Sequence, residues 1–427
     1  MTVKTATGAA AALPKAGGGS AGKSFWAWLN KRLPVDQFLA TQVTEYYAPK
    51  NFNFWYYFGS LALVVLVLQL VTGIFLTMFY KPGEATAFDS VQFIMREVDF
   101  GWLIRYLHSS GASFFFIVVY LHMFRALLYG SYKPPRELLW LLGMLVYLAL
   151  MAEAFMGYVL PWGNMSFWGA QVIINLFGTI PGIGPDLVLW IRGDYGIADA
   201  TLNRLFSLHV AAVPLALLGL VALHLVALHE VGSNNPDGIE IKDKVGADGK
   251  PLDGIPFHPY YTVKDFVGVA VFLVLLAIVV FFVPNLGGLF LEAPNYEPAN
   301  PVSTPADITP VWYFTPYYAM LRAVPDQRLG ALLLLLGVLA FMFLPWLDRS
   351  PVKSMRYRGW MSRSALAIFV VSFVGLGYLG MQPALGIYVV IARILAALYF
   401  LFFLLMPFYT KLDPVKPVPE RLVYHAH

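Results

Sequence analysis

The distribution of apolar residues predicts that this chain crosses a lipid bilayer eight times. Eight stretches are long enough to span the hydrocarbon core and almost free of charged side chains. Because a spanning segment must satisfy its own backbone hydrogen bonds, each is expected to be an α-helix. The sequence therefore predicts an all-α integral membrane protein. The spans cover approximately residues 55–79, 105–130, 139–160, 205–228, 265–284, 329–347, 364–381 and 385–407.

Polar segments divide the chain into four regions. Residues 1–50 are expected to form a basic N-terminal tail and an amphipathic lead-in; the part from Met1 to Lys23 lacks the apolar run of a signal peptide and is expected to be disordered. Residues 51–231 contain the first four spans and residues 264–427 the last four. Between them, residues 232–263 are rich in Asp, Lys, Gly and Pro and are predicted to form a connector outside the bilayer.

The lysines and arginines predict the orientation of the spans. Twenty lie in the N-terminal tail, the second, fourth and sixth connections and the C-terminal tail, against seven on the other face. Positive charge accumulates on the cytoplasmic side of membrane proteins. Both termini are therefore expected to be cytoplasmic. We call this side the basic face and the opposite side the outer face.

Composition agrees with a membrane protein and narrows the chemistry. The chain is 59% hydrophobic and 13% charged, whereas a soluble domain carries roughly 25% charged residues. It has no cysteine, which excludes disulfides and thiolate metal ligands within the chain.

Four of the eight histidines lie within the second and fourth spans. His108 and His122 are 14 residues apart, about 40° short of four helical turns, whereas His209 and His224 are 15 apart, about 60° beyond four turns. The two spans run in the same direction. His108 is therefore level with His209, and His122 with His224, with about 20 Å between the levels.

Each level pair could hold a haem iron through two imidazoles. Two imidazoles without carboxylates or thiolates make a poor zinc or copper site. A single histidine in a membrane span more often forms hydrogen bonds or relays protons, but four histidines in matched pairs favour two haems.

Glycines and arginines near these histidines fit the same hypothesis. Gly59 and Gly73 in the first span, and Gly143 and Gly157 in the third, repeat the 14-residue step and would admit a flat macrocycle close to the backbone. Ordinary small-residue helix packing is the alternative. Two arginines flank the histidines of the second span and are candidates to bind haem propionates, or simply to reach the interface: Arg105 and Arg125.

At these residues the sequence resembles cytochrome b, the core subunit of the cytochrome bc1 complex (ubiquinol–cytochrome c oxidoreductase), in its full-length bacterial form. The resemblance covers nearly the whole chain after the tail. The 15-residue histidine step is similar to that of the split chloroplast form. The strings that carry the resemblance are RYLHSSGAS, YLHMFR, GYVLPWGNMSFWG, LHEVGSNNP, HPYYTVKD and PVWYF.

The resemblance implies a dihaem electron path between two quinone sites. An outer b-type haem would be held by His108 and His209, and an inner one by His122 and His224, both without covalent attachment. Quinol would be oxidised at the outer site, and one electron would cross both haems to a quinone at the inner site. This Q cycle would generate a proton gradient.

The resemblance also implies an assembly. The other electron would leave through a Rieske-type iron–sulfur protein and a membrane-anchored c-type cytochrome, because this chain has no cysteines for either centre. Quinone and lipids are further expected partners, and no nucleic acid is expected. A homodimer in the bacterial inner (plasma) membrane is also implied.

Two sets of residues are candidates for the quinone sites. Without the resemblance, the outer set would read as interfacial anchors and the inner set as ordinary helix-end residues. The outer set is Tyr158, Pro310, Trp312, Tyr313 and Tyr318. The inner set is His229, Ser233, Asn235, Lys264 and Asp265.

One departure from the family pattern concerns the outer proton acceptor. Val311 occupies the position of a glutamate proposed to take the quinol proton in the family. Glu153 is the one carboxylate deep in a span, about 12 Å inward from its outer end. We hypothesise that Glu153 takes over part of the missing function; a hydrogen-bonded structural acid is the alternative.

Two other functions compete with this interpretation. A polytopic transporter with proton-relaying histidines would bind no haem. A different dihaem oxidoreductase would carry quinone chemistry at one face only.

Overall fold

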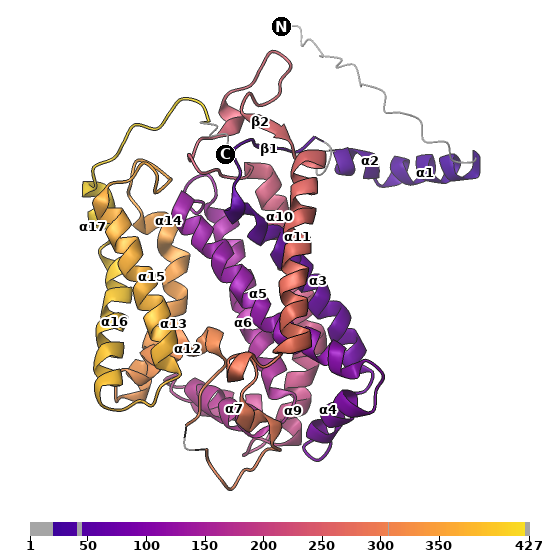
Figure 1. Ribbon diagram of the computed structural model, residues 1–427, viewed down its shortest axis with the longest axis vertical. Helices are drawn as coiled ribbons and strands as arrows, with labels where there is room; N and C mark the ends of the chain where they lie inside the picture. Colours follow the sequence, from indigo (N-terminus) through magenta and orange to yellow (C-terminus); the bar gives the residue numbers. More distant parts are fainter. Residues whose placement is uncertain (1–19, 41–44, 306, 423–427) are drawn as a thin grey trace.

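Eight helices of the described part of the chain are long and apolar enough to cross a membrane. The computed structural model describes residues 20–40, 45–305 and 307–422 (Figure 1). The prediction of an eight-span, all-α membrane protein is confirmed. The spans are Phe54–Thr77, Gly101–Tyr129, Glu137–Val159, Asp199–Val231, Phe257–Phe282, Gln327–Leu347, Trp360–Gly380 and Gly386–Leu404.

Most spans are single helices, but two are composite. The single ones are α3 (Tyr57–Thr77, led by the short turn η2, Phe54–Tyr56), α5 (Gly101–Tyr129), α6 (Glu137–Val159), α11 (Phe257–Phe282), α15 (Trp360–Gly380) and α16 (Gly386–Leu404). The fourth span joins α9 (Asp199–Ser207), the π-helical turn η3 (Leu208–Ala212) and α10 (Val213–Val231). The sixth joins α13 (Gln327–Leu339), η8 (Ala340–Phe343) and α14 (Leu344–Leu347).

The first four spans pack as two pairs. Helix α3 lies along α5, and α6 lies along α10, while α11 contacts both α3 and α5. In the C-terminal half, α15 packs against α16 and against the short helix α12 (Thr315–Arg322). One hydrophobic core runs through both halves, from Phe58 in α3 to Met406 just after α16.

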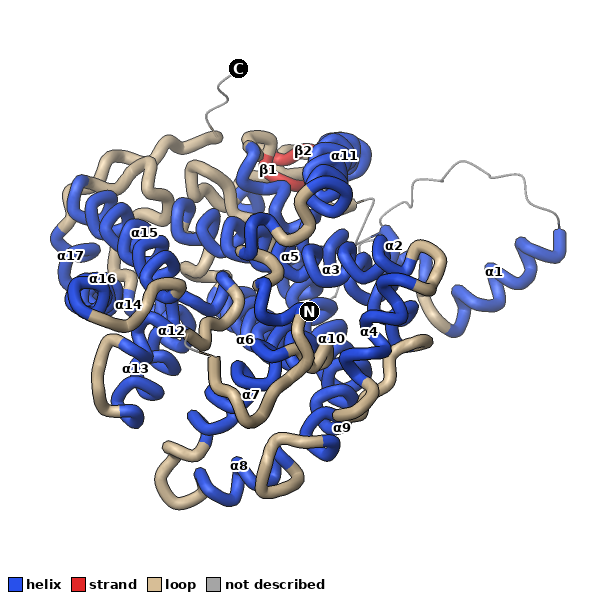
Figure 2. The backbone as a smooth tube through the Cα atoms, turned by 60° about the horizontal axis from the view of Figure 1, so that its bottom comes forward, coloured by secondary structure: helices blue, strands red, loops and turns tan. Residues whose placement is uncertain are grey.

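Short helices cover the outer face. These are α4 (Ala87–Arg96) between the first two spans, α7 (Asn164–Phe177) and α8 (Gly184–Arg192) between the third and fourth, and η5 (Leu286–Gly288), η6 (Ala293–Tyr296), η7 (Trp312–Phe314) and α12 between the fifth and sixth (Figure 2). The segment from Pro310 to Tyr313 therefore leads into a short helix on this face.

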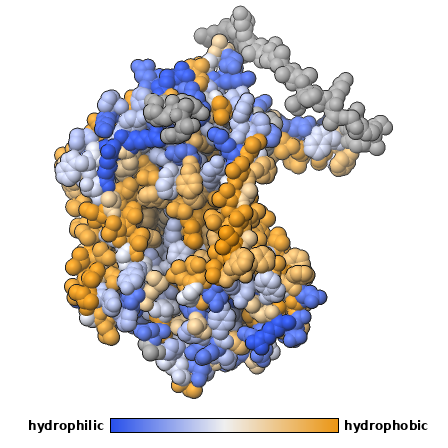
Figure 3. All heavy atoms as spheres, viewed as in Figure 1, coloured by the Kyte–Doolittle hydropathy of each residue, from blue (hydrophilic) through white to orange (hydrophobic). Residues whose placement is uncertain are grey.

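The basic face carries the lead-in and the connector. The lead-in forms α1 (Ser20–Arg32), α2 (Val35–Leu39) and β1 (Tyr47–Pro49); the connector contains η4 (Ile241–Asp243) and β2 (Gly254–Pro256), and α17 (Met406–Leu412) follows the last span. Strands β1 and β2 pair antiparallel, with Ala48 opposite Ile255. Hydrophilic residues lie above and below a hydrophobic band on the surface, as a bilayer requires (Figure 3).

Two boundaries and one pair of strands differ from the sequence-based prediction. Residues 1–19 of the segment expected to be disordered lie outside the described residues, but helix α1 begins at Ser20, so the end of that segment, up to Lys23, is helical. The connector is shorter than predicted, because α11 begins at Phe257 and not near residue 264. The β1–β2 pair was not predicted, because three-residue strands leave no periodic pattern in the sequence.

Charged clusters on the basic face join segments that are distant in sequence. The Asp348 carboxylate accepts hydrogen bonds from Tyr132, Lys133 and Arg358. Glu240 of the connector is paired in the same way with Arg136 and Lys353. Gly130, with φ of 65°, ends α5 and passes so close to the Lys353 carbonyl that a Cβ would lie 2.5 Å from it. Glycine is therefore required at this junction.

Candidate functional site

The four intramembrane histidines form two facing pairs. In the outer pair, His108 of α5 and His209 of η3 have ring centroids 6.2 Å apart and planes at 89°. In the inner pair, His122 of α5 and His224 of α10 have centroids 6.4 Å apart and planes at 61°. Two metal–nitrogen bonds of about 2 Å placed end to end would separate the centroids of two imidazoles by roughly 6 Å. Both pairs therefore fit an iron bound between them.

Hydrogen bonds at the outer pair involve the Nδ1 atoms, which makes Nε2 the candidate ligand atom of each ring. The Thr72 hydroxyl donates to the Leu68 carbonyl (2.7 Å), so its oxygen can accept from His108 Nδ1 (2.9 Å). His209 Nδ1 lies 3.0 Å from the Glu153 carbonyl oxygen and 2.9 Å from Glu153 Oε1. A histidine that donates from Nδ1 presents an unprotonated Nε2 to a metal. Both outer rings are thus held in the form that iron needs.

The inner pair has a different electrostatic environment. The Arg125 guanidinium lies over the Tyr56 ring (4.9 Å to the centroid) and 3.4 Å from His122 Nδ1. Among the described residues, Arg125 Nε and His224 Nδ1 are buried without a hydrogen-bond partner. A buried guanidinium with donors to spare beside the pair fits a site for an anionic group such as a haem propionate.

Each predicted glycine faces a predicted histidine on the neighbouring helix. The sequence-based expectation was space for a flat macrocycle, and the structure shows that the glycines make room for the imidazoles themselves. Any Cβ at these positions would approach the ring, most severely at Gly157. The Cβ–Cε1 distances would be 3.3 Å for Gly59 and His122, 3.2 Å for Gly73 and His108, 3.1 Å for Gly143 and His224, and 2.5 Å for Gly157 and His209.

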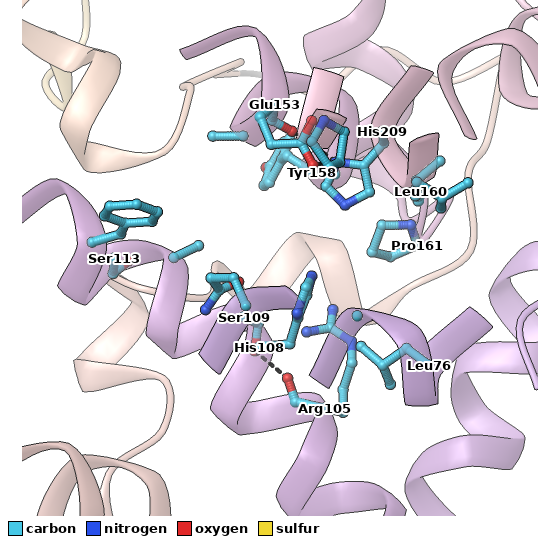
Figure 4. A pocket seen from close by; sticks show the side chains of 18 of the residues that line it. Leu76, Arg105, His108, Ser109, Ser113, Glu153, Tyr158, Leu160, Pro161 and His209 are labelled. Atoms are coloured by element: carbon cyan, nitrogen blue, oxygen red, sulfur yellow. Dashed lines mark hydrogen bonds and ion pairs between the residues drawn. The ribbon is translucent and has the colours of Figure 1, made fainter. Parts of the chain in front are cut away.

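A cavity of about 390 Å³ surrounds the outer pair. Its walls are mainly apolar, with a few polar groups gathered at the histidines. Figure 4 shows Glu153, Tyr158 and His209 close together on one side, with Arg105 and His108 across the cavity. Val311 and Tyr313 complete the part of the wall that comes from the loop between the fifth and sixth spans.

Some of the outer candidate residues line the cavity, and the others stabilise the loop beside it. Tyr158 and Tyr313 line the cavity; the Tyr313 ring stacks on Phe116 at 3.9 Å. Trp312 donates from Nε1 to the Ser113 hydroxyl (3.1 Å), which holds η7 against α5. Tyr318 donates to the Ile308 carbonyl and lies under Arg322. Trp312, Tyr318 and Pro310 are thus placed to shape the loop and not to line the described cavity wall.

One acid beside the cavity was missed in the sequence. Glu292 precedes η6, and its Oε2 accepts a hydrogen bond from the Tyr158 hydroxyl at 3.0 Å. Burial raises the pKa of Glu292 to about 7, and the hydrogen bonds to its carboxylate offset only part of this. Two features of the sequence could have identified Glu292. It is an acid directly after the apolar run Leu289–Leu291 on the outer face, and the chain has Val311 where an acid was expected.

The inner candidates are held by several different partners. The His229 ring packs on Tyr46 at 4.4 Å, and the Tyr46 and Ser233 hydroxyls are hydrogen bonded at 2.8 Å. Asp265 Oδ2 accepts from the Ser60 hydroxyl at 2.7 Å. Both His229 and Asp265 therefore have neighbours that sequence reasoning did not name.

The remaining two inner candidates differ in exposure. Lys264 is exposed and lies over the Tyr261 ring, with Nζ 5.4 Å from its centroid. Asn235 is fully buried and forms hydrogen bonds with the backbone of Asp237 and Ile239. Asn235 thus stabilises the start of the connector, whereas Lys264 is available at the surface.

Two family models match the chain and together cover most of it. The model described as cytochrome b/b6/petB matches residues 43–232, and the one described as cytochrome b(C-terminal)/b6/petD matches residues 298–400. The first includes all four paired histidines. The second includes Val311 and the part of its loop from residue 298 onward.

Curated relatives and a solved structure are similar over nearly the full length. A cytochrome b from Allochromatium vinosum is 60% identical over 404 residues, which cover 93% of this chain and 97% of the relative. One from Rhodobacter capsulatus is 43% identical over 414 residues, covering 92% and 93%. A chain in a solved structure titled "Hyperthermophilic respiratory Complex III" is 40% identical, with a TM-score of 0.83, covering 90% of this chain and 98% of that chain.

Proposed function

This chain belongs to the cytochrome b family, and from that premise we propose that its two histidine pairs hold two b-type haems that connect an outer and an inner quinone site. The chain is a core subunit of a quinol–cytochrome c oxidoreductase, with a quinol-oxidising, electron-transferring role in a membrane. The proposal concerns the number of haems, their ligands and the path between them.

The single observation that carries the proposal is the matched geometry of the pairs. Both have centroid separations that suit two imidazoles on one iron, and each imidazole faces a glycine that leaves it space. A relay of protons between isolated histidines would need neither feature. The bound haems would supply reversible one-electron chemistry, which no side chain of this chain provides.

The protein's own residues orient the ligands and shape the sites. Thr72 and Glu153 fix the ring orientation of the outer histidines through Nδ1. Arg125 places positive charge beside the inner pair. At the outer cavity, Tyr158 and Tyr313 line a mainly apolar space suited to a quinol ring. His229, Ser233, Lys264 and Asp265 are proposed for the inner quinone site.

The orientation and partners follow from the same proposal. The basic face is cytoplasmic, in a bacterial inner membrane, and quinol is oxidised at the outer face. An iron–sulfur protein and a c-type cytochrome take the second electron, since this chain has no cysteine for either centre. The transporter alternative does not account for two metal-spaced histidine pairs in a chain of this family.

Removal of one histidine at a time tests the proposal. In the assembled complex, a redox titration of the b-type absorbance bands should resolve two haems. The variants His209→Leu and His224→Leu should each lose one of them. His258→Asn changes an exposed histidine outside the pairs and should retain both. Two titrating haems in His209→Leu or in His224→Leu would contradict the assigned ligands.

A further inference from the structure

Quinol oxidation at the outer site requires a proton acceptor, and the expected position is apolar. Quinol gives up two protons with its two electrons. Val311 lines the outer cavity but cannot take a proton. The following inference rests on the proposed function of that cavity as the quinol-oxidising site. It concerns which group replaces the missing acid and where the proton leaves.

Tyr158 and Glu292 form a hydrogen-bonded link that begins at the cavity wall. Tyr158 lines the outer cavity, and its hydroxyl donates to Glu292 Oε2 at 3.0 Å. The two residues are 134 positions apart and come from α6 and from the loop before η6. The Glu292 carboxyl is thus connected to the cavity through the Tyr158 phenol and one hydrogen bond.

Glu292 also borders a second, smaller cavity on the outer face. This cavity has a volume of about 50 Å³ and lies between α4, the start of α5 and η6. Its polar lining includes Gln92, Arg105 and Asn295, and the last two also line the larger cavity. Tyr296 at its wall is 44% exposed. Since one water needs roughly 15 Å³ by this measure, the smaller cavity can hold water between Glu292 and the surface.

The groups around Glu292 favour exchange of a proton near neutral pH. The ionisable neighbours at its cavity and hydrogen bond are Tyr158, Tyr313, Arg105, Tyr106 and Tyr296. Burial raises the pKa of Glu292 to about 7, whereas that of Tyr296 is raised to about 12. A carboxyl with this pKa can both take and release a proton at physiological pH.

Glu153 is the competing acid. Its Oε1 lies 2.9 Å from His209 Nδ1, and its backbone carbonyl is bound to the same nitrogen. Protonation of this carboxyl would remove a partner from a proposed haem ligand. The side-chain hydrogen bond of Glu292 is instead to Tyr158, and Glu292 adjoins the small cavity toward the outer surface.

We propose that Glu292 accepts a quinol proton through Tyr158 and releases it to the outer face through the small cavity beside α4. In this step the quinol O–H bond breaks and its proton moves to the Tyr158 oxygen. The Tyr158 hydroxyl proton moves to Glu292 Oε2, so the phenol ends neutral. The carboxylic acid then loses its proton to water in the small cavity.

The remaining products of quinol are also accounted for. In the proposed function, one electron would pass to the iron–sulfur partner and the other to the outer haem. The second proton leaves with the electron that goes to the iron–sulfur partner, outside this link. Quinone is the product, and Glu292 returns to its carboxylate form for the next turnover.

Substitution of Glu292 tests the proposal in the assembled complex. Glu292→Gln preserves size but cannot accept the proton, so quinol oxidation at pH 7 should fall by about 100-fold, the contribution of one general base. In the wild-type complex the rate should rise with pH through about 7 as the carboxylate forms. That rise should be absent in Glu292→Gln and present in Glu292→Asp. Tyr158→Phe, which breaks the link, should also slow oxidation.

Three controls separate this proposal from its alternatives. Glu297→Gln, in the same loop but exposed, should leave the rate and its pH profile unchanged. The carboxylic C=O band of Glu292 in infrared difference spectra should disappear in Glu292→Gln, a signature that a merely structural role would not produce. Haem content, haem potentials and quinol-driven haem reduction through the inner site should be unaffected.

The outcomes are distinguishable. A wild-type rate and pH profile in Glu292→Gln with both haems present would overturn the role of Glu292, and so would loss of the pH-dependent rise in Glu153→Gln alone. A wild-type rate in Tyr158→Phe would overturn the link through the phenol. Absence of b-type haem from the wild-type complex would instead refute the proposed function.

Discussion

At the scale of single residues, the two histidine pairs differ in what surrounds them. The outer pair donates from Nδ1 to Thr72 and to the Glu153 carboxylate, whereas the inner pair has Arg125 at His122 Nδ1. An anionic acceptor makes an imidazole a stronger electron donor to its metal, and a nearby cation has the opposite effect. In the proposed dihaem arrangement, this contrast would favour electron flow from the outer haem to the inner one.

Among the four glycines that face the histidines, the shortest distance from an added Cβ to the ring is at Gly157, and it predicts the loss of one haem only. A Cβ on Gly157 would lie 2.5 Å from His209 Cε1 and 3.0 Å from Nε2. We therefore expect Gly157→Ala to displace the His209 ring and to remove the outer haem while the inner one remains. The redox titration of the haem bands measures this directly.

Two glycines provide the comparison for Gly157→Ala. At Gly219, in the same span as His209, a Cβ would meet nothing within 4 Å, so Gly219→Ala should retain both haems. At Gly59 the corresponding distance is 3.3 Å, so Gly59→Ala should shift the inner haem's spectrum more than its occupancy. Full outer haem content in Gly157→Ala would show that the ring has room that the structure does not indicate.

Some of these residues could be predicted from the sequence and others could not. The histidines and glycines repeat at helical spacing within single spans, so helix geometry alone places them on common faces. Glu292 and Tyr158 are joined only by the folding of a loop that returns 134 residues later, and no periodicity reports such a contact. The same is true of Tyr46, which reaches His229 from the lead-in before the first span.

At the scale of elements, the π-helical turn η3 explains why the two histidines of the fourth span can be one residue further apart than those of the second span. The fourth span carries its histidines 15 residues apart, one more than the second span. Five residues around His209, from Leu208 to Ala212, form η3, and a π-turn accommodates one extra residue within a helix. The 15-residue step is thereby equivalent to 14 in regular helix, so the two spans present their histidines with matching offsets. Hydropathy could locate this span but not the turn within it.

This explanation predicts that one deletion is tolerated and one insertion is not. Pro214 lies in the first turn of α10 and has no backbone N–H for a helical hydrogen bond. Deletion of Ala211 combined with Pro214→Ala should therefore convert the turn to regular α-helix with a 14-residue step, and both haems should be retained. Insertion of one alanine after Gly219 should rotate His209 by about 100° relative to His224. We expect that variant to lose one haem, measured by haem content per chain and by the redox titration.

The reverse pattern would refute the role of the π-turn. If the shortened span lost a haem and the lengthened one kept both, the extra residue would have to be absorbed elsewhere in α10. Normal levels of the chain in the membrane provide the control that each variant inserts.

At the scale of the whole molecule, charged clusters on the basic face join the two halves. Asp348, after the sixth span, is bound by Lys133 from the loop between the second and third spans and by Arg358 before the seventh. All three side chains are nearly or fully buried. Hydrophobic patterning predicts the spans of each half and the shared apolar core, but these charged contacts between the halves come from loop residues, which carry no periodic signal.

The loss of one charge in this cluster is expected to weaken the junction between the halves. Asp348→Asn would leave Lys133 and Arg358 buried without their counter-charge, which costs about 3–5 kcal/mol in comparable buried pairs. The midpoint of thermal denaturation in detergent should fall. Asp248→Asn is the matched control: its partner Lys250 is 4.0 Å away and both are largely exposed, so its effect should stay below about 1 kcal/mol.

The same cluster predicts how stability depends on pH. Burial by itself would raise the pKa of Asp348, but attraction to Arg358 and Lys133 and the hydrogen bonds donated by Arg358 and Tyr132 hold it below its usual value. A depressed carboxyl pKa stabilises the fold fully above the unfolded-state pKa, and that contribution is lost as pH falls through the folded-state value. The denaturation midpoint of the wild type should therefore fall on acidification, and Asp348→Asn should lose part of that dependence. An equal acid sensitivity in both would mean that other carboxyls, such as Glu240 beside Arg136 and Lys353, govern the junction, and Glu240→Gln would then be the variant with a flattened profile.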